Sequence, residues 1–82
     1  MPDKPETSFV ELFVRHQRSI YGYILSIVPN ANEADDIFQE ASLILWKKAD
    51  EFDAKQEFLS WAYGIARNVA RNHRAKMARD RH

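Results

Sequence analysis

Residues 32–48 read NEADDIFQEASLILWKK, and this stretch decides the fold of the chain. Its apolar side chains recur at steps of three and four residues, which is the period of an α-helix with one buried face. We expect Asn32 to cap this helix, because the carboxylates that follow it suit the positive end of the helix dipole. The predicted core side is formed by Ala34, Ile37, Phe38, Ala41, Ile44 and Leu45. An apolar side of this width needs other helices to cover it.

The residues before this stretch predict a first helix that begins at Ser8. Ser8 and Glu11 have the spacing of a capping box. Pro29 ends the helix, because proline disfavours helical geometry at the residue before it. The apolar stripe of this helix consists of Phe9, Phe13, Ile20, Ile24 and Ile27. Residues 1–7, with two prolines and alternating charge, are expected to form a disordered tail.

The residues after it predict a polar loop over 49–57 and a third helix that starts near Phe58 and runs into the basic end of the chain. The predicted core stripe of the third helix is Phe58, Trp61, Ala62, Ile65 and Val69. No alternating pattern typical of a strand occurs. The sequence therefore predicts an all-α fold, a compact three-helix bundle over residues 8–80 with a short extra helical turn allowed in the loop.

The charges cancel over the whole chain but are sorted along it. Residues 30–57 carry eight acidic side chains against three lysines, whereas residues 58–82 carry six basic side chains against one aspartate. An acidic surface suits a basic protein partner, and a basic helix suits phosphate. The sorting favours an adaptor that joins a protein to a nucleic acid.

Composition argues against several other classes of protein. The chain has no cysteine, which excludes a disulfide scaffold and a cysteine-containing zinc site. His16, His73 and His82 are scattered and no glycine-rich loop occurs, so we predict no metal, no cofactor and no enzymatic activity. The apolar runs are too short for a membrane span and the N-terminus lacks a signal peptide, so a cytoplasmic protein without membrane contact is expected.

The side of the second helix opposite its core carries residues that a solvated face does not need. They are Leu43 and Trp46, which stand there together with the polar residues Asp36, Gln39, Glu40 and Lys47. A leucine and a tryptophan framed by polar groups are typical of an apolar anchor with a polar rim. The alternative is that Trp46 folds back over the bundle and Leu43 is an ordinary exposed leucine.

The third helix carries a basic row opposite its core. Three arginines at steps of four and three residues repel one another, and a nucleic-acid backbone would relieve that repulsion. Amides and an indole beside the row can hydrogen-bond to bases or stack on them. With the loop included, the predicted nucleic-acid-binding residues are Phe52, Lys55, Trp61, Arg67, Asn68, Arg71, Asn72 and Arg74. The alternative is a solvated basic face.

An ordered set of short motifs resembles a known family. The motifs are DDIFQE (35–40), LILW (43–46), FD (52–53), FLSW (58–61) and IARN (65–68), followed by Arg71. Together they resemble the second conserved region of bacterial RNA polymerase sigma factors of the extracytoplasmic-function type, over roughly residues 8–79. Gly64 and Ile65 stand where housekeeping sigma factors carry an aromatic pair, and this lack is shared by the extracytoplasmic-function members.

The resemblance implies a partner for each predicted face. In that family the acidic helix docks on the clamp helices of the largest subunit of core RNA polymerase, and Asp36, Gln39 and Glu40 match its polar contacts. The loop and third helix recognise the minus-ten element of promoter DNA and stabilise its melted non-template strand. Asn68 and Arg71 match positions at the upstream edge of that element. An anti-sigma factor could bind either face.

The resemblance also shows two departures. The family's C-terminal helix-turn-helix domain is absent, so we expect a domain excerpt, and a glycine frequent in the family's loop is missing between Asp50 and Glu57. Two other functions stay open on the residues alone. One is a small helical nucleic-acid-binding protein without polymerase contact, and the other is a protein-interaction adaptor that touches no DNA.

Overall fold

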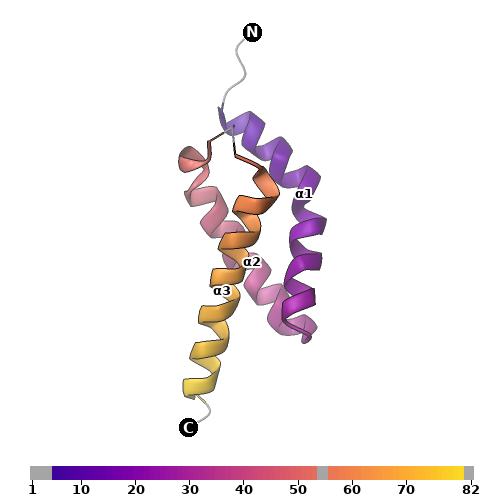
Figure 1. Ribbon diagram of the computed structural model, residues 1–82, viewed down its shortest axis with the longest axis vertical. Helices are drawn as coiled ribbons and strands as arrows, with labels where there is room; N and C mark the ends of the chain where they lie inside the picture. Colours follow the sequence, from indigo (N-terminus) through magenta and orange to yellow (C-terminus); the bar gives the residue numbers. More distant parts are fainter. Residues whose placement is uncertain (1–4, 54–55, 81–82) are drawn as a thin grey trace.

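The structure, a computed structural model, describes residues 5–53 and 56–80 and contains three α-helices. They are α1 (Pro5–Ile27), α2 (Ala31–Lys47) and α3 (Phe58–Asp80), with a short 3₁₀ turn, η1 (Ala49–Glu51), between α2 and α3. Figure 1 shows that α1 and α3 run in one direction and that α2 runs in the opposite direction, crossing behind α3. The predicted all-α three-helix bundle is therefore confirmed, including the extra turn in the loop.

The core is built from one side of each helix. Its largest fully buried side chains are Ile20, Ile24, Val28, Ile37 and Leu45. Val28 takes the place predicted for Ile27, which is exposed. The reason is that Val28 follows Ile24 by one full turn, and its N–H donates to the Ile24 carbonyl at 2.8 Å. The helical path thus continues far enough past Ile27 to bury the next residue.

The first helix begins earlier than predicted. It starts at Pro5, so the prediction that Ser8 caps it is wrong. Proline is well suited to a first helical position, because its fixed φ is helical and the N–H that it lacks would have no partner there. Of the predicted tail, residues 5–7 lie in α1, and residues 1–4 lie outside the described residues.

The cap of α2 is also shifted from its predicted position. Asn30 is the N-cap, and its side-chain oxygen accepts a hydrogen bond of 3.0 Å from the N–H of Glu33. Its extended backbone, with φ of −94° and ψ of 118°, is the geometry of a capping residue. The predicted cap, Asn32, instead lies inside the first turn of α2.

Alanine substitutions distinguish which of the two asparagines, Asn30 or Asn32, caps α2. We expect Asn30→Ala to destabilise the domain by about 1 kcal/mol, because it leaves a helix N–H without its acceptor. The matched change Asn32→Ala should stay within about 0.5 kcal/mol, since Asn32 is exposed and provides no cap. Urea unfolding followed by circular dichroism measures both values. Equal losses in the two variants would contradict the assignment of Asn30.

The third helix packs through small residues. Its buried side chains are Phe58, Ala62, Ala66, Val69 and Ala70. Trp61 and Ile65, which were predicted in the middle of the stripe, are only half-buried. Alanines allow close approach of helix backbones, so the side of α3 that bears them turns towards α1 and α2. This rotation leaves Trp61 and Ile65 at the edge facing α2.

An aromatic cluster closes the bundle at the end where the loop joins α3. Phe58 is its centre, with ring centroids 5.8 Å from Phe9, 5.5 Å from Phe52 and 6.0 Å from Trp61. Edge-to-face and tilted pairs of this kind stabilise a core beyond the area that they bury. Phe52 therefore packs against the bundle and anchors the loop to the start of α3.

Candidate protein and nucleic-acid interfaces

The predicted protein-binding residues of α2 share one exposed surface, which we name the acidic face. It consists of Asp36, Gln39, Glu40, Leu43 and Trp46, all of which are exposed. Leu43 is 64% exposed and Trp46 is 40% exposed, so both offer apolar surface to a partner. The face thus combines exposed apolar side chains with carboxylates, a composition that also occurs at protein-binding surfaces.

Trp46 folds back over the bundle, as the alternative predicted, but stays partly exposed, and its place in an interface remains a prediction. Its ring meets Phe9 edge-to-face at 5.0 Å and lies 5.5 Å from Phe13, so the indole does fold back onto α1. It nevertheless keeps 40% of its surface exposed. The contacts with α1 hold the indole in one orientation, which lowers the entropy that a partner's binding would have to remove.

A hydrogen bond that the sequence did not reveal fixes α1 against α2 beside this face. The Tyr21 hydroxyl donates to Oδ1 of Asp35 at 2.6 Å. That bond raises the pKa of Tyr21 above its ordinary value, and partial desolvation and the negative charge of Asp35 add to the effect. Fourteen residues separate the two partners, so no local sequence pattern announces this contact.

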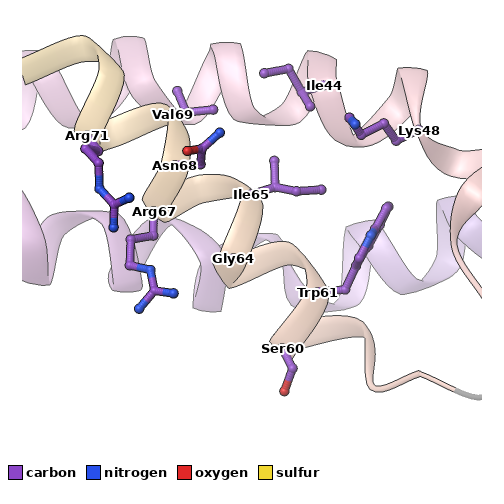
Figure 2. A pocket seen from close by; sticks show the side chains of 10 residues that line it. All are labelled: Ile44, Lys48, Ser60, Trp61, Gly64, Ile65, Arg67, Asn68, Val69 and Arg71. Carbon is purple, nitrogen blue, oxygen red and sulfur yellow. The ribbon is translucent and has the colours of Figure 1, made fainter. Parts of the chain in front are cut away.

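The predicted nucleic-acid-binding residues gather partly in one groove between α2 and α3, shown in Figure 2. We name it the α2–α3 groove. From α3 it is lined by Trp61, Arg67, Asn68 and Arg71, and from α2 by Ile44 and Lys48. Among the described residues that line it there are three cations and no carboxylate. A basic groove with an indole and an amide can attract a phosphate backbone and hold bases.

The other predicted nucleic-acid-binding residues lie elsewhere. Asn72 lines a second groove, in which Asp36 and Glu40 of α2 face Lys76 of α3. Arg74 lines neither of these two grooves and instead shares a smaller surface pocket with Glu33. Because this second groove mixes charges of both signs, it is less suited to a phosphate backbone than the α2–α3 groove.

Two of the predicted nucleic-acid-binding residues, Phe52 and Lys55, belong to the loop between α2 and α3. Phe52 is half-buried, with its ring 4.9 Å from that of Trp61, so it packs against the indole. Lys55 lies outside the described residues. Two hydrogen bonds fix the start of α3: the Ser60 hydroxyl donates to Oε1 of Glu57 at 2.7 Å, and the N–H of Trp61 donates to the Glu57 carbonyl at 3.2 Å.

Sequence reasoning missed Lys48 and Gly64 as residues that line the groove. Lys48 follows Ile44 by four residues. The helical period therefore already indicated that Lys48 lies on the same side of α2 as Ile44. Gly64 carries no side chain, and its place in the groove follows only from the packing of α3.

The described residues contain neither a cluster of metal ligands nor a helix that could span a membrane. No three or more histidine, aspartate or glutamate side chains among them are grouped so that they could hold a metal ion. His16 stacks on Phe58 with ring centroids 5.6 Å apart, and His73 is half-buried at the second groove. Within the same part of the chain, none of the helices combines the length and the apolar character that crossing a membrane requires.

Comparison with known proteins gives one consistent family. The family model for sigma-70 region 2 matches residues 12–80. The RNA polymerase sigma-H factor of Pseudomonas aeruginosa is 36% identical over 66 residues, which cover 80% of this chain and 34% of that protein. No solved structure gives a significant match.

Two further relatives carry the extracytoplasmic-function (ECF) designation. The ECF RNA polymerase sigma factor SigW of Bacillus subtilis is 31% identical over 64 residues, covering 78% of this chain and 34% of SigW. The ECF RNA polymerase sigma-E factor of Escherichia coli K12 is 31% identical over 68 residues, covering 83% of this chain and 35% of the relative. The chain thus spans about a third of the length of these relatives.

Proposed function

This chain belongs to the sigma-70 region 2 family, and from that premise we propose that it binds core RNA polymerase and the promoter minus-ten element. It is a sigma factor domain of transcription initiation and not an enzyme. The observation that carries the proposal is the separation of two exposed surfaces of opposite character on one small bundle. The acidic face lies on α2, where Asp36 and Glu40 also line the second groove, and none of its residues lines the basic α2–α3 groove.

The acidic face supports the polymerase half of the proposal. The clamp helices of the largest polymerase subunit are the partner implied by the motifs, with Asp36, Gln39 and Glu40 as polar contacts. Leu43 and Trp46 supply exposed apolar surface beside these contacts, towards the C-terminal end of α2. An anchored tryptophan with charges at its edge is the arrangement that concentrates binding energy at protein interfaces.

The α2–α3 groove supports the DNA half. Melting a duplex costs stacking energy, and a site that holds extruded bases offsets that cost. Trp61 provides a partly exposed ring and Asn68 an amide, while Arg67 and Arg71 can hold phosphates of the non-template strand. A domain with this role acts on chromosomal DNA together with the polymerase, so the proposal includes a cytoplasmic location. It also includes an anti-sigma factor as a further protein partner.

Two paired variants test the two halves separately. Asp36→Arg with Gln39→Ala should weaken binding to a purified clamp-helix fragment by about tenfold or more, because it places a cation where a basic partner docks. Arg67→Glu with Arg71→Glu should keep that binding and abolish binding of single-stranded DNA at low salt. All four side chains are exposed, so both variants should remain folded by circular dichroism.

The outcomes also separate the two alternative functions. Unchanged clamp-helix binding in the first variant would remove the acidic face from the proposal, whereas absence of clamp-helix binding by the unmodified chain would remove polymerase and leave a nucleic-acid binder. DNA binding that survives the second variant would remove the groove from the proposal, whereas absence of DNA binding by the unmodified chain would leave a protein-interaction adaptor.

A further inference from the structure

We propose that Lys48 of α2 is a further nucleic-acid-binding residue, which contacts a phosphate of the strand held in the α2–α3 groove. The inference rests on the proposed DNA-binding function and adds to it a contact from the helix otherwise assigned to the polymerase. Neither the basic row of α3 nor the sequence motifs include this residue. Its assignment comes from its position across the groove from α3.

The end of α2 holds Lys48 in a defined place. Lys48 is the C-cap of α2, and its N–H donates to the Ile44 carbonyl at 2.9 Å. Its backbone is therefore fixed by the helix, whereas its side chain is exposed and lines the groove. Figure 2 shows Lys48 on the α2 side beside the ring of Trp61, and Arg71 towards the opposite end of the groove.

The spacing of the cations fits a nucleic-acid strand with several phosphates rather than a single bound anion. Trp61 and Arg71 are ten residues apart on α3, which corresponds to about 15 Å along a helix. Lys48 stands near the Trp61 end, so positive charge is present at both ends of the groove, with Asn68 between them. A phosphodiester backbone carries its charges at regular intervals and can meet several cations at once.

The charge of the lining favours nucleic acid over other ligands. The α2–α3 groove has three cations and no carboxylate among its described lining residues, whereas four carboxylates stand against two cations, Lys76 and Arg79, in the second groove. An acidic peptide would also suit a positive groove. The partly exposed indole of Trp61 and the amide of Asn68 favour DNA, because bases can stack and hydrogen-bond there.

A simpler role for Lys48 is stabilisation of α2 through the helix dipole, which favours a cation at this end. The chain offers a matched control, because Lys47 is also exposed and lies in the last turn of the same helix. Lys47 carries the same charge but is not among the residues that line the groove. A dipole effect or a loss of net charge would therefore appear in both variants, and a contact in the groove only in one.

The experiment measures binding of the full chain to a short fluorescent single-stranded DNA of mixed sequence over a range of salt concentrations. For Lys48→Ala we expect the slope of log affinity against log salt to fall in magnitude by about 0.7, the value for one phosphate contact on a single strand. Lys47→Ala should leave the slope unchanged. Arg71→Ala serves as a positive control for the groove itself.

Each other outcome overturns the assignment. Equal losses in Lys47→Ala and Lys48→Ala would reduce the effect to net charge. A loss in Arg71→Ala alone would reject Lys48 and leave the proposed DNA function intact. Poly-glutamate that competes as strongly as DNA would replace nucleic acid by an acidic protein. Absence of DNA binding by the unmodified chain at low salt would reject the DNA function together with this inference, while clamp-helix binding would still test the polymerase half.

Discussion

Phe58→Ala is expected to destabilise the domain by about 3–5 kcal/mol, the range for removing a buried phenylalanine side chain. Phe58 is 5% exposed and lies where α1, the loop and the start of α3 meet. Its ring contacts Phe9 of α1 and Phe52 of the loop and stacks on His16. A domain of this size has a total stability of only about 5–15 kcal/mol, so the variant should be close to unfolding at room temperature.

Urea unfolding followed by circular dichroism measures this loss. Val14→Ala is the matched control, because Val14 is 56% exposed on α1 and its removal should change stability by less than about 0.5 kcal/mol. A loss below about 1 kcal/mol in Phe58→Ala would contradict its central place. If the variant does not fold at all, Phe58→Leu keeps most of the volume and should cost less than alanine.

The second large effect is expected at Trp46. We expect Trp46→Ala to weaken binding to the polymerase clamp helices by about 2 kcal/mol or more, which is about thirtyfold in affinity. The same change should also lower stability, because the indole packs on Phe9 and Phe13. Binding must therefore be compared under conditions in which circular dichroism shows the variant to be fully helical.

Leu43→Ala separates a loss of clamp-helix binding from a loss of stability. Leu43 is 64% exposed, so its removal should weaken clamp-helix binding without a measurable change in unfolding. Isothermal titration of both variants against the clamp-helix fragment gives the comparison. If folded Trp46→Ala and Leu43→Ala both bind as tightly as the unmodified chain, the acidic face is not the polymerase-binding surface.

Much of the fold was predictable because helix period and helix breakers are local properties. The apolar steps of residues 34–45 and the proline at 29 set the number and order of the helices. Helix ends were less predictable. Two asparagines stand in the turn before α2, and which of them caps it depends on where the chain leaves α1. The sequence pattern contains no information on that point.

The sequence predicted which residues share one face of a helix, but not which residues of different helices share a groove. A helical wheel placed Asn72 and Arg74 beside the other nucleic-acid-binding residues of α3, because a wheel ignores position along the axis. In the structure Trp61, Arg67, Asn68 and Arg71 share the α2–α3 groove, whereas Asn72 faces the acidic end of α2. Lys48 was not predicted, because a pattern read along α3 cannot include a residue that lines the groove from the end of α2.

The sequence by itself determined three helices, the apolar sides that they bury, the sorting of acidic and basic charge, and the family to which the chain belongs. The tertiary structure alone decided which charges share a groove, how Trp46 rests on α1 and how α3 is rotated about its axis. The physical reason is that period, capping and charge act within a few residues of the chain. Rotation and juxtaposition instead depend on how closely the alanines of α3 pack against two other helices.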